Sequence, residues 1–339
     1  MLRTSGPKIQ TLFKKLPMRL KIILQILISL LLLGCSGRDD AVETNIHARI
    51  ALYDGALSDD GRYAIAATVN HGVGFWDVSS NKLLFRWRHG DDEAKDILHA
   101  VISPDNQYAV TAEMRAFVVW DTKSGQSLGY WEMPDEIMAI DISDGGRFVA
   151  IGLETGTVHH VDLKTGRRLE YFGHKDKVNS VSLSANGRYV LTGGNDYQAM
   201  LWDAQSGQPL HHFKHEHRVT LVELSSDGRY ALSASAHGEA KIWHINDGTL
   251  QRRLHFGEKP FTLVSARFSE NSQYLATGGA ARIIQLWDVA SGQSIKRWKV
   301  RNRNIWRPSG AIVYDVAFSR DNQWLISESS NGLNQRWKL

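Results

Sequence analysis

The chain has 339 residues, a single cysteine, and 40 Lys and Arg against 36 Asp and Glu, which gives a formal net charge of +4. One cysteine excludes an intramolecular disulfide. Six of the cations lie in the first 34 residues, which contain no Asp or Glu, so the remainder has 34 cations against 36 anions and a net charge of −2. Nucleic-acid binding relies on Lys and Arg that neutralise phosphates, and it therefore loses its main support.

The first 34 residues differ in kind from the rest of the chain. Their basic stretch leads into an apolar run at residues 22–33, which at twelve residues is too short for a bilayer span of about 20. A basic region, a short apolar core and a small residue before a cleavage site together predict a secretory signal peptide. A segment that begins at Met18 has the same three parts, so translation from Met1 and translation from Met18 both remain open.

The end of this segment, Leu32-Leu33-Gly34-Cys35, resembles the lipobox of bacterial lipoproteins, although Leu33 is bulkier than usual there. The resemblance implies a signal peptide at 1–34, lipidation of Cys35 and a short tether at 35–43. Ser36 replaces the Asp that retains such proteins in the inner membrane, which favours the outer membrane of the cell envelope, facing the periplasm. Two alternatives remain: a buried thiol after a hydrophobic helix, and a single-span anchor.

Seven segments of the remaining chain share one pattern, in which a serine-led turn precedes an alternating apolar strand that starts with an aromatic residue. The segments begin at Ser58, Ser103, Ser143, Ser184, Ser225, Ser269 and Ser319. Their Asp-Gly, Asn-Gly and Asp-Asn pairs tolerate the positive φ of tight hairpin turns. A second landmark follows each serine at Trp76, Trp120, Val161, Trp202, Trp243, Trp287 and Trp337, usually with Asp next, at spacings of 41 to 50 residues.

This repeat of short strands and Trp-Asp pairs resembles the WD-repeat family. The resemblance implies that residues 44–339 form an all-β, seven-bladed propeller with four antiparallel strands per blade. The seventh repeat ends after its third strand, and the only unassigned strand-like material is at residues 42–50. We therefore predict that the N-terminal strand pairs at the outer edge of the last blade, which removes an exposed edge and closes the ring.

The repeat from Phe172 to Asp203 is closest to the family pattern. Within it, the resemblance assigns a structural hydrogen-bond tetrad to His174, Thr192, Asp196 and Trp202. The pairing of His and Asp beside a hydroxyl is also compatible with catalysis, but buried polar groups need partners and a structural network supplies them. In other repeats the place of the Asp holds His237 or Ala281, and we predict that those blades rely on apolar packing and on Trp.

The sequence contains no enzyme signature: no G-x-S-x-G elbow, no H-E-x-x-H, no pair of cysteines and no phosphate-binding glycine loop. We predict that the protein is not an enzyme and has no cofactor. The best metal candidate is the histidine-rich stretch at residues 211–217. His211 and His212 face opposite ways on a strand and His215 aligns with His174, so no metal site is assigned, although metal use by this cluster stays open.

The function favoured by these features is a lipid-anchored periplasmic platform, a scaffold or assembly factor, that binds a protein or peptide partner. This expectation rests on analogy with envelope propeller lipoproteins and treats the propeller itself as a monomer. The alternative is a propeller enzyme or small-ligand sensor with a site in the central channel. That alternative requires convergent polar groups in the channel, and the strands that would line it show nothing decisive.

In WD-repeat proteins, partners usually contact the face that carries the d–a loops and b–c turns. Carried onto matching positions, the resemblance implies contacts at Asp96, Glu113, Glu136, Glu154, Lys177, Asn195, Arg218 and Tyr314. The second and third blades also place Asp91, Asp92 and Glu93 on this face, and an inserted basic loop brings Arg301, Arg303, Trp306 and Arg307. Segregated charge of this kind predicts a dipolar docking face with Trp306 as an anchor. The alternative is a solvated basic loop with Trp306 packed on its own blade.

Overall fold

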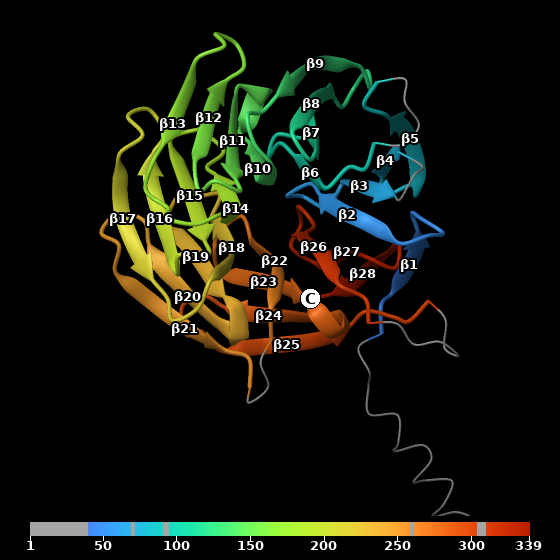
Figure 1. Ribbon diagram of the computed structural model, residues 1–339. Coiled ribbons are helices and arrows are strands. Elements are labelled where there is room, and N and C mark those ends of the chain that lie inside the picture. The colour runs from blue at the N-terminus through green and yellow to red at the C-terminus, as the bar shows by residue number, and fades with distance from the viewer. Residues whose placement is uncertain (1–39, 69–71, 91–94, 258–260, 304–309) are drawn as a thin grey trace, which may run out of the picture. The chain divides into compact units, whose positions relative to one another are not determined.

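The computed structural model describes residues 40–68, 72–90, 95–257, 261–303 and 310–339. Residues 1–40 and 41–339 are separate units, and the second is a folded domain. Its described residues form 28 strands in seven antiparallel four-stranded sheets, arranged as blades around a central channel (Figure 1). Among the described residues, no helix combines the length and the hydropathy needed to cross a bilayer.

Six blades are built from consecutive strands. Blade 1 comprises β2 (Leu52–Leu57), β3 (Tyr63–Thr68), β4 (Gly72–Asp77) and β5 (Lys82–Trp87). Blade 2 comprises β6 (His99–Ile102), β7 (Tyr108–Glu113), β8 (Ala116–Asp121) and β9 (Ser127–Glu132). Blade 3 comprises β10 (Ile137–Ile142), β11 (Phe148–Leu153), β12 (Val158–Asp162) and β13 (Arg168–Tyr171).

The next three blades follow the same order from the channel outwards. Blade 4 comprises β14 (Val178–Leu183), β15 (Tyr189–Gly194), β16 (Gln198–Asp203) and β17 (Pro209–Lys214). Blade 5 comprises β18 (Val219–Leu224), β19 (Tyr230–Ser235), β20 (Glu239–His244) and β21 (Leu250–His255). Blade 6 comprises β22 (Leu263–Phe268), β23 (Tyr274–Gly279), β24 (Ile283–Asp288) and β25 (Ser294–Lys299).

Blade 7 joins the two ends of the domain. It comprises β26 (Val313–Phe318), β27 (Trp324–Ser329), β28 (Leu333–Lys338) and, at its outer edge, β1 (Glu43–Ile46). In this antiparallel pair Thr44 lies opposite Gln335, whose Nε2 donates a hydrogen bond of 3.0 Å to the Thr44 hydroxyl. The predicted fold class is therefore confirmed, including closure of the last blade by the N-terminal strand. The strand stops at Ile46 because the His47 N–H donates instead to the carbonyl of Gly332 in the β27–β28 turn.

The serine of each repeat closes the turn between the first and second strands of its blade. In blade 1 the Ser58 hydroxyl donates to Asp60 and accepts the backbone N–H of Tyr63 at 2.9 Å. The turn residue Gly61 has a φ of +66°, a conformation that glycine adopts without strain. The same serine-to-aromatic bond recurs in the other blades, so the repeated motif specifies seven equivalent hairpins.

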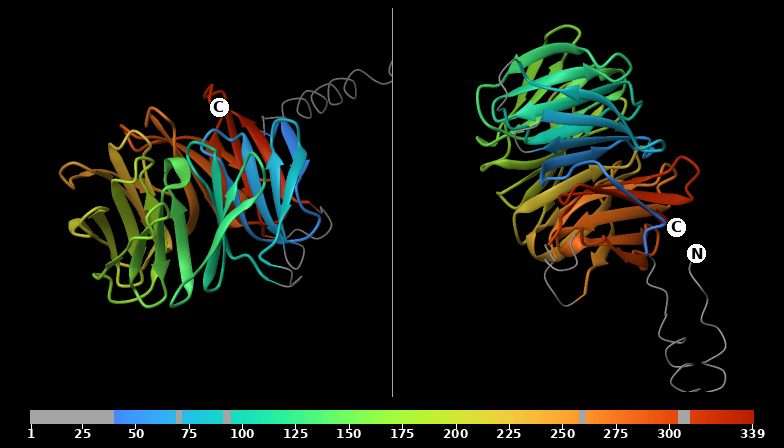
Figure 2. Two further views of the ribbon diagram at one scale, coloured as in Figure 1. Left: turned by 90° about the horizontal axis from the view of Figure 1, so that it is seen from above. Right: turned by 90° about the vertical axis from the view of Figure 1, so that its right-hand side faces the viewer.

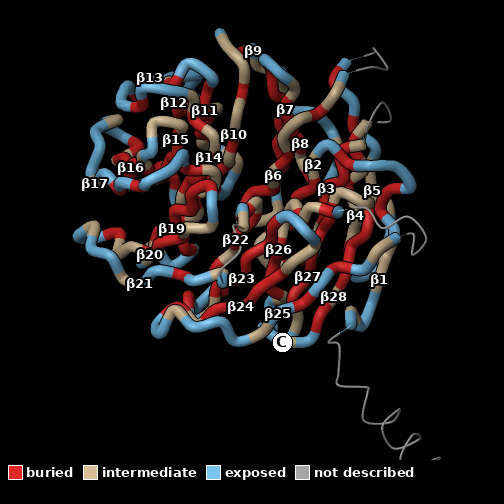
Figure 3. The backbone as a smooth tube through the Cα atoms, turned by 60° about the horizontal axis from the view of Figure 1, so that its bottom comes forward, coloured by how far each residue is buried: buried red, intermediate tan, exposed pale blue. Residues whose placement is uncertain are grey.

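The core lies between neighbouring blades. Aromatic side chains stack across these junctions, as in Trp87 on Trp120, with ring centroids 5.0 Å apart, and Tyr171 on Trp202, at 5.4 Å. Figure 2 shows the strands of the blades running between the two faces of the ring, and Figure 3 shows that, among the strands, the outermost ones carry most of the exposed positions.

Candidate functional site

The four side chains of the predicted tetrad are joined by hydrogen bonds in blade 4. His174 Nε2 lies 2.7 Å from the Thr192 hydroxyl, which also accepts the Trp202 indole N–H at 2.9 Å. His174 Nδ1 lies 3.0 Å from Asp196 Oδ1. Burial alone would raise the pKa of Asp196, but the hydrogen bond from His174 holds it below its ordinary value. With each of these groups partnered and His174 buried, the arrangement stabilises the blade and leaves no free nucleophile or base.

Two further blades contain the same kind of network with a glutamate in place of the aspartate. In blade 2, His89 lies 2.7 Å from the Thr111 hydroxyl and 3.3 Å from Glu113. In blade 5, His215 lies 2.7 Å from the Ser233 hydroxyl and 3.0 Å from Glu239. A Trp indole donates to the hydroxyl in each case.

The prediction that the blade with His237 relies only on apolar packing and Trp is therefore wrong. Glu239 lies two residues after His237. Its side chain is longer than that of an aspartate and reaches the buried His215. Burial lowers the pKa of His215 to about 4. Burial alone would raise the pKa of Glu239, but the hydrogen bond from Lys241 helps to lower that pKa to about 2. In the blade with Ala281, a bond of 2.9 Å from the Trp287 indole to the Thr277 hydroxyl remains.

The predicted contact positions are brought together by backbone hydrogen bonds between loops. The Glu154 N–H donates to Glu136 O at 3.0 Å, and the Asn195 N–H donates to Lys177 O at 2.9 Å. The next blade repeats this bond between Ala236 and Arg218, at 3.0 Å. Each bond ties a b–c turn to the d–a loop that leads into its own blade. Residues from separate repeats therefore share one face of the ring, which we call the d–a face.

The side chains on the d–a face differ in how accessible they are. Glu154 and Arg218 are exposed, whereas Glu136, Lys177 and Asn195 are half-buried. Two other predicted contacts are partly occupied within the protein. Asp96 accepts a hydrogen bond of 3.2 Å from the Tyr53 hydroxyl, and the half-buried Tyr314 donates to Leu52 O at 3.1 Å.

Glu113, the last residue of β7, makes more contacts within the protein than the sequence indicated. Its Oε1 accepts hydrogen bonds from the Tyr130 hydroxyl at 2.8 Å and from Lys95 Nζ at 3.1 Å, in addition to the contact with His89. Burial would raise the pKa of Glu113, but these partners lower it. This carboxylate therefore has a structural role that the sequence did not reveal.

The basic part of the d–a face includes Arg301 and Arg303, both exposed. Arg303 Nη1 donates to Ala48 O at 3.1 Å, and Asn331 Nδ2 donates to Arg301 O at 3.2 Å, so the loop is held at the junction of blades 7 and 1. Several predicted sites lie outside the described residues. These are Cys35, Asp91, Asp92, Glu93, Trp306 and Arg307.

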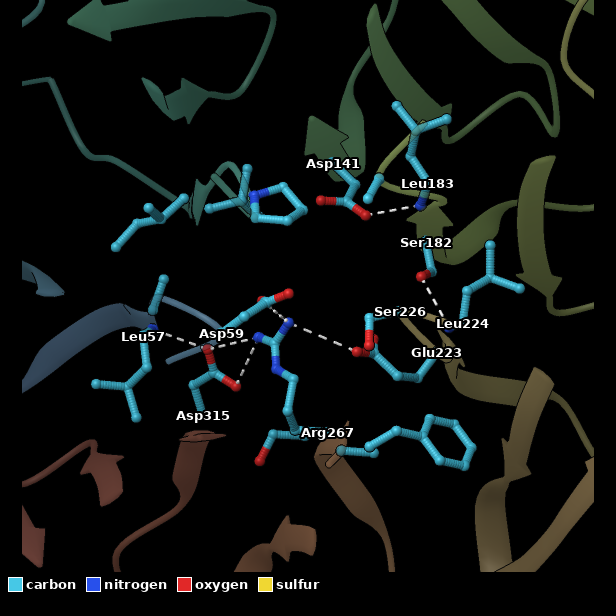
Figure 4. Close-up of a pocket in the computed structure, with 18 of the residues that line it drawn as sticks. Leu57, Asp59, Asp141, Ser182, Leu183, Glu223, Leu224, Ser226, Arg267 and Asp315 are labelled. Atoms are coloured by element: carbon cyan, nitrogen blue, oxygen red, sulfur yellow. Dashed lines mark hydrogen bonds and ion pairs between the residues drawn. The ribbon is translucent and has the colours of Figure 1, made fainter. Parts of the chain in front are cut away.

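A cavity of about 700 Å³ occupies the central channel, and the Arg267 side chain of β22 projects into it (Figure 4). Its Nη1 lies 2.6 Å from Asp59 Oδ1, and its Nη2 lies 3.3 Å from Asp315 Oδ2. Glu223 is 3.6 Å away on another side. The four side chains come from blades 6, 1, 7 and 5. The channel thus contains the convergent polar groups that the sequence did not show.

Burial shifts the acid–base behaviour of the channel carboxylates. It raises the pKa values of Asp54 and Asp141 to about 7, and that of Glu223 well above its ordinary value. Asp54 and Asp141 each accept a backbone N–H from the inner strand of the next blade, at 2.8 Å from Ala100 and 2.7 Å from Leu183. These carboxylates therefore join neighbouring blades as well as lining the channel.

The histidine-rich stretch at 211–217 does not converge on one point. His215 belongs to the blade 5 network, and His211 Nε2 lies 3.0 Å from the carbonyl of Ile245. His217 packs against His237, with ring centroids 4.5 Å apart. Within the described part of the chain, no group of three or more His, Cys, Asp or Glu side chains is placed to hold a metal ion.

Comparison with known families agrees with the fold. The family model for the WD domain, G-beta repeat, matches residues 166–203, 207–244 and 252–288. The chain contains WD40 repeats. The matched segments take in most of blades 4, 5 and 6 of this WD40 propeller, and the other four blades share their strand order and turn chemistry. No curated protein matches the chain. WD40 propellers are generally non-catalytic scaffolds that bind protein partners.

Proposed function

We propose that this WD40 propeller is a non-enzymatic platform that binds a protein or peptide partner through its d–a face. We further propose that it is anchored through lipid on Cys35 to the outer membrane of a bacterial envelope, facing the periplasm. The observation that carries the platform function is the gathering of Glu154, Lys177 and Arg218 on one face by equivalent backbone bonds. Such a surface needs no catalytic group, and the His-containing networks beneath it are internally paired.

The charges on the d–a face suit a partner that carries both acidic and basic side chains. Glu136 and Glu154 belong to blade 3, whereas Lys177 and Arg218 belong to blades 4 and 5. Lys95 lies 3.1 Å from Glu113 and partly neutralises the acidic blade 2. Arg218 makes no ion pair with any other described residue, so its charge is available to an acidic segment of a partner. Segregated charges of this kind steer association and fix the orientation of a partner.

Crosslinking in the native envelope tests the platform. Wild-type protein is expected to capture a stoichiometric protein partner, and a Lys177→Glu, Arg218→Glu variant should lose it while its melting temperature stays nearly unchanged. Lys123→Glu, on an exposed turn between β8 and β9, is the matched control and should capture normally. Trp306→Ala tests the proposed anchor in the same assay. Equal loss in the control, or full capture by the double variant, would place the site elsewhere.

The anchor has a separate test. Cys35→Ala is expected to accumulate as an uncleaved or mislocalised precursor whose propeller still folds, since Cys35 precedes the folded domain at residues 41–339. Cell fractionation and the mass of the purified protein give the readout. Normal processing and normal fractionation of the alanine variant would exclude lipidation.

A second candidate function is a sensor for a small cationic ligand in the channel. Ten carboxylates line the cavity against only Arg267 and Arg320. They are Asp54, Asp59, Asp60, Asp105, Asp141, Asp144, Glu223, Asp227, Glu270 and Asp315. Spermidine should then raise the melting temperature of the wild type more than that of Glu223→Gln. Equal shifts in the two proteins would remove this candidate.

A further inference from the structure

The outermost strand of each blade presents alternate side chains to solvent. In β25 of blade 6, Ile295, Arg297 and Lys299 are exposed, whereas the intervening Trp298 is buried. In β5 of blade 1, Arg86 is exposed beside the buried Trp87, and Arg88 is exposed directly after the strand. Each of these two strands therefore shows a cationic stripe to the outside of the ring.

The outermost strand of blade 7, the blade between blades 6 and 1, exposes two apolar side chains. Val42, just before β1, is 64% exposed and Ile46 is 51% exposed, with the uncharged Thr44 between them. Its one acidic residue, Glu43, lies 3.8 Å from Arg336 and is partly neutralised. Two exposed apolar side chains, Val42 and Ile46, are thus flanked on both sides by cationic strands.

The three strands belong to one continuous stretch of the rim. Trp298 of β25 packs against Trp337 of β28, with ring centroids 6.3 Å apart, and β28 pairs directly with β1. On the other side, Trp324 of blade 7 and Trp76 of blade 1 pack against the same apolar cluster. Figure 1 shows β25, β1 and β5 as the outer strands of successive blades. We call this stretch the anchor-side rim, because residues 1–40 join the propeller at β1.

Charge sets the anchor-side rim apart from the outer strands of blades 2 and 3. Residues 82–88 and 294–299 contain six cations and no Asp or Glu. These are Lys82, Arg86, Arg88, Lys296, Arg297 and Lys299. In the outer strands of those two blades, β9 and β13 together contain Glu132, Glu170 and a single cation, Arg168, whereas β21 of blade 5 is also cationic, with Arg252 and Arg253. The anchor-side strands and those of blades 2 and 3 therefore differ in the sign of their net charge as well as in the number of charged side chains.

We propose that the anchor-side rim docks on an anionic lipid membrane. Long Lys and Arg side chains are attracted to anionic headgroups. Val42, Ile46 and Ile295 are separate apolar side chains on strand edges, and they suit shallow insertion among headgroups better than a shaped protein pocket. Docking through the rim leaves both faces of the ring, including the d–a face, free for a protein partner. The inference does not require lipidation of Cys35, although an anchor there would bring this rim to the same surface.

Site-specific fluorescence on the full-length chain tests the proposal, in a Cys35→Ala background. An environment-sensitive label is placed at Ile46→Cys or, as a matched control across the ring, at Leu210→Cys, a residue 45% exposed in β17 of blade 4. The probes are vesicles of phosphatidylcholine alone and of an equimolar mixture with phosphatidylglycerol. The Ile46 label should shift to the blue with the anionic vesicles only, the shift should weaken with salt, and the Leu210 label should not respond.

Charge reversal separates this docking from membrane binding by residues 1–40. Arg297→Glu with Lys299→Glu should weaken the Ile46 response to anionic vesicles by about tenfold or more in lipid concentration. Arg167→Glu with Arg168→Glu, on blade 3, should leave it unchanged. If the first pair disturbs folding, Arg86→Glu with Arg88→Glu provides the same reversal from blade 1. Equal shifts at both labels, equal shifts with neutral vesicles, or no effect of either reversal would overturn the proposal, whether or not partner capture on the d–a face holds.

Discussion

His47 and Glu328, 281 residues apart in the chain, form a fully buried pair at the junction of the first and last blades, with Nδ1 2.9 Å from Oε2. Asn334 Nδ2 donates to the same carboxylate oxygen at 3.0 Å. A Cβ atom at Gly55 would lie only 2.9 Å from Glu328 Cγ, so blade 1 fits closely around this side chain. Ring closure therefore depends on a buried polar contact as well as on the pairing of β1 with β28.

Removal of this carboxylate should loosen the closure. Glu328→Ala leaves His47 and Asn334 without their shared partner, and each buried polar group left unpaired costs about 1 to 3 kcal/mol. Chemical denaturation should show that loss in the free energy of unfolding. Glu154→Ala, an exposed carboxylate, is the matched control and should change it by less than about 0.5 kcal/mol. An unchanged stability for Glu328→Ala would mean that β1 pairing alone closes the ring.

Blade 1 offers a stabilising substitution. The position of Thr192 in blade 4 is occupied in blade 1 by Ala66, and the buried indole N–H of Trp76 has no partner among the described residues. Ala66→Ser supplies the missing hydroxyl and should raise the free energy of unfolding by about 1 kcal/mol. In a Trp76→Phe background the same serine should give no gain. A gain that persists there would show that the serine acts through another contact.

The blade 4 network predicts a pair of contrasting variants. Thr192→Val keeps the shape of the side chain but leaves His174 Nε2 and the Trp202 indole N–H without their shared partner, at a cost of about 2 kcal/mol or more. Thr192→Ser keeps the hydroxyl, as blade 5 does naturally with Ser233, and should lose much less. Thermal unfolding of both variants measures the difference, and equal losses would argue that the methyl group matters more than the hydrogen bonds.

The channel predicts a pH dependence of stability. Burial raises the pKa values of Asp54 and Asp141 from 3.8 to about 7, so over that interval the folded state binds more protons than the unfolded state. The contribution of these groups to stability therefore falls as pH rises from about 4 to about 7. The positive charge of Arg267 favours the ionised form of Asp141, so the destabilisation by Arg267→Leu should be larger at about pH 8 than at about pH 5. A loss independent of pH would show that Arg267 acts through packing alone.

The fold was predictable because each blade repeats its own local chemistry. Ser58 and its six equivalents close the same turn, and the aromatic residue that follows marks the start of the same strand, so the period alone indicates the number of blades. Closure by the N-terminal strand followed from counting strands in the last repeat. These features are local in sequence, or depend only on the order of repeats.

The features that the sequence did not reveal depend on the length of a side chain and on the geometry of the closed ring. A search for aspartate at the place of His237 overlooks Glu239, whose longer side chain contacts the same histidine from two residues away. Arg267, Asp59 and Asp315 belong to three different blades, and each is unremarkable within its own repeat. Only the closed ring brings them within ion-pair distance, so no single repeat reveals the channel cluster.

The pairing of β1 with β28 also sets the order of folding. Thr44 and Gln335, which bond across this pair, are 291 residues apart in the chain, so β1 stays unpaired until β28 has been synthesised. Until then β1 has an unpaired edge next to Val42 and Ile46, the kind of surface that pairs with other chains. A contact of such long range also slows folding, because the whole intervening chain must first be ordered. We therefore expect completion of blade 7 to remove this exposed edge, and a chain truncated before β28 to aggregate more readily than the complete domain.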